Sequence, residues 1–183
     1  MRWERLFADL EGQAEAAEQL ARADEVADRV RQELARRTVA DRLRAAIGVP
    51  IDVTLDGAGG LAGRVAQVGD GWMLLTRERG PDALVLLSAI RGLRGLVVAA
   101  VEPGTAGRMA ARLSVAHALR LIARDRSPVT LLHRDHETLS GTIDRVGADY
   151  IDLVARPAER SRRVASSVST TVPFEAIAAV LAG

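Results

Sequence analysis

The segment His133-Arg134-Asp135-His136-Glu137 holds the densest group of metal-ligand side chains in the sequence. Two imidazoles and two carboxylates within five residues are groups that could bind a divalent cation. A structural metal site needs about four well-placed ligands, and His117 is the one further histidine in the chain. We therefore interpret the segment as a polar hairpin turn, and we expect neither a metal nor a cofactor.

Two further patterns could suggest catalysis. The stretch Gly57-Ala58-Gly59-Gly60 falls between two expected strands, whereas a phosphate-binding loop lies between a strand and the N-terminus of a helix. Ser114 and His117 have no nucleophile-elbow glycines around them, and Ser114 is of the type that caps a helix. The chain has no cysteine, which excludes disulfides and cysteine nucleophiles. We expect that the protein is not an enzyme.

Arginine could bind phosphate groups, but its frequency here is uninformative. All 25 basic residues are Arg, and Lys and Asn are both absent, as a high-GC bacterial genome would produce. Only the placement of Arg therefore counts. Residues 101–126 hold five Arg against two acids, and the loop 156–163 holds four Arg. Neither stretch has the interleaved aromatic residues on which single-stranded nucleic acid usually stacks, so a solvated surface is the competing interpretation. The candidate nucleic-acid-binding residues are Arg91, Arg108, Arg112, Arg120, Arg124, Arg156, Arg160, Arg162 and Arg163.

An internal repeat indicates which elements would position these side chains. At a constant offset of 78 residues, the segment from Pro50 to Leu75 aligns with that from Pro128 to Leu153 without a gap. Residues 38–44 match 114–120 at an offset of 76, and residues 85–90 match 172–177 at an offset of 87. Identities in one collinear order indicate a duplication.

Each copy predicts a short helix followed by five short strands. Apolar residues alternate in the first strand at Ile51, Val53 and Leu55, as in a half-buried strand. Turn residues follow, and the second strand carries a glycine at mid-length, Gly63 or Gly141. Such a glycine is typical of a strongly bent strand in a small barrel. We expect the connection between the copies to include a helix over residues 105–124.

The first 37 residues favour a long amphipathic helix. They contain no proline and a single glycine, and apolar residues recur every three or four positions. The seam changes phase near residue 22, so one helix and two helices are both open. Small alanines along the seam would suit packing against a partner helix, and packing on the chain's own barrels is the alternative.

The repeated unit resembles the Sm, Sm-like and Hfq family of small barrels. The resemblance rests on a helix followed by the pattern Leu61-x-Gly63-x-Val65-x-x-Val68 and its copy from Leu139, together with Ala89-Ile90-Arg91-Gly92. It covers residues 38–97 and 114–182 and implies RNA binding and ring assembly through exposed fourth and fifth strands. The family's Asp and Met-Asn positions carry Gly69 and Trp72-Met73 here, and the second copy departs in the same way.

The sequence therefore predicts a mostly β, α+β chain. We expect an N-terminal helical segment (1–37), a first Sm-like, SH3-like five-stranded barrel (38–101), and a second barrel with its connecting helix (102–183). The expected function is a non-catalytic binding and assembly module, and an RNA-binding regulator is the alternative. Expected partners are a second copy, through barrel edges or the N-terminal helix, an unidentified protein, or RNA. A net charge of +1, 27% charged residues and no long apolar run favour a cytoplasmic protein without membrane contact.

Overall fold

The structure is a computed structural model that describes residues 22, 25, 28–29, 31–32, 35–96, 112–155 and 169–182. It divides into two units, residues 1–38 and 39–183, and the sheet described below belongs to the second unit. The predicted separation of 38–101 from 102–183 as two domains stays a prediction, because residues 97–111 between them are outside the described part.

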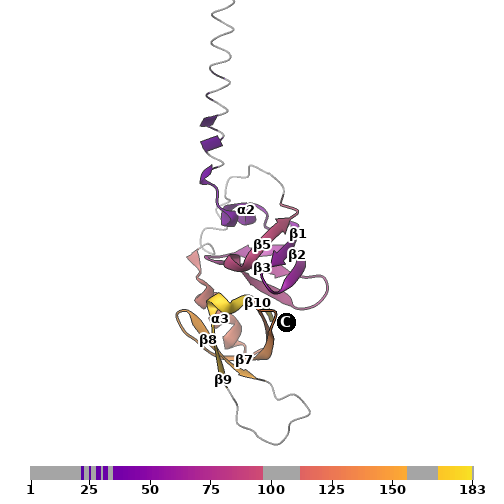
Figure 1. Ribbon diagram of the computed structural model, residues 1–183, viewed down its shortest axis with the longest axis vertical. Helices are drawn as coiled ribbons and strands as arrows, with labels where there is room; N and C mark the ends of the chain where they lie inside the picture. The colour runs from indigo at the N-terminus through magenta and orange to yellow at the C-terminus, as the bar shows by residue number, and fades with distance from the viewer. Residues whose placement is uncertain are drawn as a thin grey trace, which may run out of the picture. The chain divides into compact units, whose positions relative to one another are not determined.

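The first copy of the repeat begins with helix α2 (Val39–Ala45) and continues through five strands (Figure 1). In β1, Ile51, Val53 and Leu55 are buried while the alternate residues are exposed, so one face of the strand covers the core. A 3-10 turn at Leu87–Ala89 joins the last two strands. The strands are β1 (Pro50–Leu55), β2 (Gly59–Val68), β3 (Trp72–Thr76), β4 (Asp82–Leu86) and β5 (Ile90–Arg94).

The second copy repeats this order. Helix α3 spans Val115–Arg124, and a 3-10 turn at Phe174–Ala176 precedes the last strand. Ser114 caps α3, because its hydroxyl accepts a hydrogen bond from the His117 amide at 3.3 Å. Of the helix expected over residues 105–124, the structure shows α3 from Val115, after this cap, and residues 105–111 lie outside the described part. The strands are β6 (Val129–His133), β7 (Thr138–Val146), β8 (Tyr150–Ala155), β9 (Ser169–Pro173) and β10 (Ile177–Ala182).

The prediction of two separate barrels is wrong. All ten strands form one antiparallel sheet in the order β5-β1-β2-β3-β4-β10-β6-β7-β8-β9, and the sheet is not closed into barrels. The outer edge of β4 pairs with β10, placing Leu84 opposite Val180 and Val85 opposite Ala179. Because the second copy occupies that edge of the first, the sheet continues from one copy into the other.

The prediction of a long N-terminal helix is likewise not supported by the structure. The described positions within the first 37 residues are scattered and establish no long helix. Among the residues that the structure describes, α2 and α3 are the α-helices with defined bounds. The apolar seam expected before the change of phase near residue 22 lies outside the described residues.

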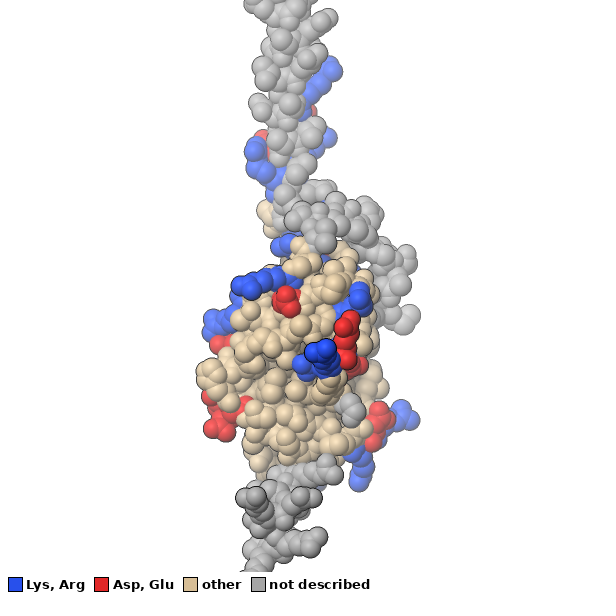
Figure 2. All heavy atoms as spheres, turned by 90° about the vertical axis from the view of Figure 1, so that its right-hand side faces the viewer, with Lys and Arg blue, Asp and Glu red and all other residues tan. Residues whose placement is uncertain are grey.

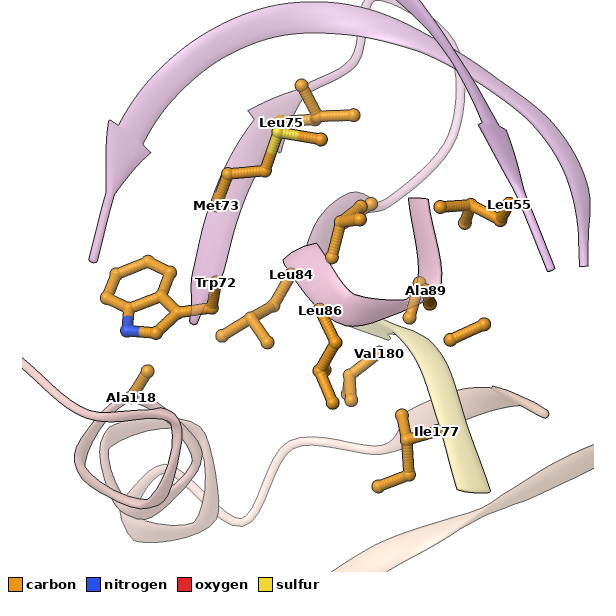
Figure 3. Packing of buried hydrophobic residues seen from close by; sticks show 14 of the residues in the cluster. Leu55, Trp72, Met73, Leu75, Leu84, Leu86, Ala89, Ala118, Ile177 and Val180 are labelled. Atoms are coloured by element: carbon orange, nitrogen blue, oxygen red, sulfur yellow. The ribbon is translucent and has the colours of Figure 1, made fainter. Parts of the chain in front are cut away.

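One aliphatic core runs through both copies. It includes Leu43 from α2, Leu119 from α3, and inward-facing residues of strands from both halves. Figure 3 shows Leu84 and Leu86 of the first copy beside Ile177 and Val180 of the second. None of the described charged or polar residues is buried, so burial of apolar surface is the main stabilising term.

The glycines in the middle of β2 and β7 have a packing role. A Cβ on Gly141 would lie 2.3 Å from the carbonyl oxygen of Val154, and one on Gly63 would lie 2.9 Å from that of Thr76. These glycines therefore permit close approach of the neighbouring strand, which explains their place in both copies without a closed barrel.

Candidate binding surfaces

The joint between the two copies shows what an edge strand of this sheet can bind. Leu84 and Leu86 of β4 are each only 3% exposed, and Val180 of β10 is fully buried opposite Leu84. Figure 3 shows these side chains and Ile177 directed into a shared apolar space. The joint thus combines backbone pairing with two leucines placed two positions apart.

Polar contacts tie the same joint together at its two ends. The indole nitrogen of Trp72 donates to the carbonyl oxygen of Leu113 at 2.8 Å, and its ring lies against Ala118 of α3 (Figure 3). Arg134, in the turn between β6 and β7, donates to the Ser88 hydroxyl at 2.5 Å and to the Ser88 carbonyl at 3.2 Å. Both contacts join residues of different copies.

The first copy presents a surface equivalent to β10 along the free edge of β5. At the offset of 87 residues, Ile90 corresponds to Ile177 and Leu93 to Val180. Within the described residues, β5 pairs with β1 alone, so its other edge has no strand partner. A groove of about 400 Å³ follows this edge. Its apolar lining is Val39, Leu87, Ile90, Leu93 and Leu96.

This β5 groove differs from its counterpart in charge. Arg91, Arg94 and Arg42 are exposed where the second copy has Ala178, Leu181 and Ala118. Arg91 pairs with Asp56 at 2.9 Å, whereas Arg42 and Arg94 form no ion pair among the described residues, and Asp52 of β1 lies opposite Arg94 in the ladder. The groove is therefore apolar with Arg42 and Arg91 at its rim, while Arg94 lies further along β5 and lines a neighbouring concavity.

The opposite edge of the sheet, β9, is polar. Thr171 and Pro173 stand at the positions that Leu84 and Leu86 occupy in β4. The Thr171 hydroxyl donates to the Asp152 carboxylate at 2.6 Å, which keeps this cross-strand pair turned to solvent. Proline and polar residues on an edge strand are features that oppose pairing with another strand.

A second concave surface lies between α3 and strands β7 and β8. Its volume is about 990 Å³, and Arg120, Arg124, Arg126 and Arg145 line it with Tyr150. Arg120 donates to the Gly147 carbonyl at 3.3 Å, and Arg145 lies 3.6 Å from Asp144. Tyr150 is 38% exposed. Four guanidinium groups beside an exposed ring could bind a phosphate-bearing ligand.

The structure brings together only part of the predicted arginine set. Arg120 and Arg124 lie one turn apart on α3 and share this arginine groove. Arg112 precedes α3, and Arg91 lies on β5 in the other copy. Arg108, Arg156, Arg160, Arg162 and Arg163 are outside the described residues.

Sequence reasoning missed Arg126, Arg145 and Tyr150 as members of the groove. Arg145 follows a register shift in β7, between Ile143 and Arg145, and this irregularity is not marked by any sequence pattern. Tyr150 could have been found from the repeat, because it occupies the position of Trp72.

The His133–Glu137 segment forms a turn and part of the joint. The His133 amide donates to the Glu137 carbonyl at 3.0 Å, and the Glu137 amide donates to the Asp135 carboxylate at 3.0 Å. In the described ranges, no three side chains of His, Asp or Glu are grouped so that they could hold a metal ion. Sequence reasoning did not foresee that Arg134 reaches across to Ser88.

The face in Figure 2 carries Arg and acidic residues side by side over a largely uncharged surface, rather than one basic field. Of the helices described, none has the length and apolar character needed to cross a membrane.

Comparisons with protein-family models, with curated proteins and with solved structures gave no match.

Proposed function

We propose that this chain is a non-catalytic binding and assembly module that takes up another protein through the free β5 edge of its sheet. The observation that carries the proposal is the joint between β4 and β10, where one copy of the repeat binds the edge of the other. The β5 groove is the equivalent surface of the first copy, and nothing in the described residues pairs with it.

The physical basis is the addition of a strand to an open edge. Unpaired backbone N–H and C=O groups along β5 can form a ladder with an extended segment. The apolar lining of the β5 groove can bury side chains from one face of that segment. Affinity would then come from backbone pairing, and specificity from the groove and its arginines.

Photocrosslinking in the source cells tests this proposal. A photoreactive phenylalanine analogue replaces Arg94 on β5, and in the control chain it replaces Leu121, which is 52% exposed on α3. We expect a crosslinked protein adduct of discrete mass from position 94, at least about fivefold above the control. Equal yields from both positions, or no adduct from position 94, would refute binding at this edge.

RNA binding is the second candidate function, and the arginine groove of α3, β7 and β8 favours it. Contacts from its four Arg to a single strand predict a slope of about −2.8 for log affinity against log salt. Replacing both Arg124 and Arg126 with alanine should make this salt dependence half as steep, with a slope of about −1.4. The measurement is fluorescence anisotropy with labelled single-stranded RNA.

A matched control separates this candidate from the first. The double replacement of Arg42 and Arg94 removes the same charge beside the β5 edge and should leave the salt slope unchanged. A variant with alanine at all four arginines of the 156–163 loop tests in the same assay whether that loop contributes to RNA binding; the four are Arg156, Arg160, Arg162 and Arg163. RNA that fails to bind even at low salt eliminates this function.

A further inference from the structure

We propose that the β5 groove binds an extended segment of a different protein, with two large aliphatic residues two positions apart and a carboxylate opposite Arg94. This inference rests on the proposed function and names the partner's chemistry. The occupant is a heterologous strand and not the β9 edge of a second copy.

The chain contains its own template for the occupant. β10 receives β4, and the two leucines of β4 fill the apolar space beside Ile177 and Val180. Ile90 and Leu93 hold the corresponding positions on β5 and are only partly buried there. A segment with the apolar alternation of β4 therefore matches the shape of the β5 groove.

The template also sets the register. In the joint, Leu84 faces Val180 and Ala83 faces Leu181. Transferred to β5 by the offset of 87, the incoming leucine faces Leu93 and the preceding residue faces Arg94. Directly opposite residues of antiparallel strands lie on the same face, so a side chain at that preceding position can reach Arg94.

Arg94 on β5 changes the preferred residue at this position. Ala83 suits the aliphatic Leu181 in the joint, but Arg94 is exposed and forms no ion pair among the residues described; Asp52 lies opposite it on the β1 side. A glutamate in place of the alanine would form a cross-strand ion pair with Arg94. Such an exposed pair contributes about 0.2–1 kcal/mol, a change of up to about fivefold in affinity.

A second copy fits the same groove poorly. Its β9 would present Thr171 and Pro173 where β4 presents leucines. The hydrogen bond between Arg134 and Ser88 would also have no equivalent. At the repeat-equivalent positions, Asp56 stands in place of Arg134 and Glu175 in place of Ser88. Glu175 would then face the Asp56 carboxylate in place of a guanidinium, with Arg91 already paired to Asp56, so the attractive turn contact of the joint would be lost.

Three labelled peptides and the full chain test the inference by fluorescence anisotropy. The first peptide has the sequence of residues 79–89, and the second carries Ala83→Glu in that sequence. The third has the repeat-equivalent sequence of residues 166–176, which contains β9. We expect the second peptide to bind about threefold more tightly than the first, and the third to bind at least tenfold more weakly.

The Arg94→Leu variant localises the binding. It restores the residue that β10 carries at Leu181, so the preference for glutamate should disappear while the first peptide still binds. Circular dichroism of the variant confirms folding, since Arg94 is exposed. An unchanged preference for glutamate would place the peptide elsewhere and overturn the proposal.

The remaining outcomes separate this inference from the proposed function. Tight binding of the third peptide would identify a second copy as the occupant and overturn the inference alone. Crosslinking from position 94 without binding of either aliphatic peptide would also overturn the partner's chemistry but keep the edge as an interface. Absence of both crosslinking and peptide binding removes the proposed function as well.

Discussion

Replacing Trp72 with alanine should lower the free energy of unfolding by about 3–5 kcal/mol, because it empties a large buried site at the joint between the copies. Trp72 is only 4% exposed and packs toward Ala118 of the other copy (Figure 3). The change also removes the donor for the Leu113 carbonyl, which leaves that acceptor without its 2.8 Å hydrogen bond.

Tyr150→Ala provides the matched control for this prediction. Tyr150 holds the equivalent position in the second copy, but it is 38% exposed. In the described part of the chain, no helix covers it as α3 covers Trp72. We expect a loss of about 1 kcal/mol. Urea unfolding followed by circular dichroism measures both variants. Equal losses would show that the joint does not depend on Trp72.

Replacing Gly57 with alanine is the second change for which we expect a large effect. Gly57 has a φ of +66°, and a Cβ at this position would lie 1.9 Å from the backbone oxygen of Arg134. The two turns would have to separate, which would weaken the hydrogen bonds from Arg134 to Ser88. We expect a loss of at least about 3 kcal/mol, because a backbone clash cannot be relieved by a rotamer change.

Gly59→Ala isolates the steric part of that effect. Gly59 begins β2 directly after the same turn and has a φ of +72°, yet a Cβ there would meet no atom within 4 Å. Only the strain of the left-handed conformation remains, at about 1–2 kcal/mol. The same urea titration compares the two variants. Similar losses for both would mean that the turns of the two copies do not touch in solution.

The positions of the strands followed from the sequence because they depend on local pattern. Ile51, Val53 and Leu55 alternate with polar residues, and β1 buries that face. The repeat then located the second set, and Ser114 marked the start of α3. These features are determined by side-chain periodicity and by capping, which act over a few residues.

The candidate site was recovered only in part, because a groove is built from residues that are distant in sequence. Arg120 and Arg124 could be placed on one helix face from their spacing. Arg145 joins them through the packing of α3 on β7 and a shift of register in that strand. The edge of the fifth strand was expected as an association surface, but the lining of the β5 groove was missed, because it comes from α2, the 3-10 turn and β5 together.

What the sequence determined by itself was a duplicated unit of one helix and five strands, because hydrophobic alternation and turn residues are local properties. Only the tertiary structure decided how the two units combine. An open strand edge pairs with another edge that is near and apolar, and here Leu84 lies opposite Val180 and Val85 opposite Ala179 of the other copy. The pairing of β4 with β10 depends on contacts between residues about a hundred positions apart in the sequence. It joins the copies in one sheet and leaves the β5 edge open.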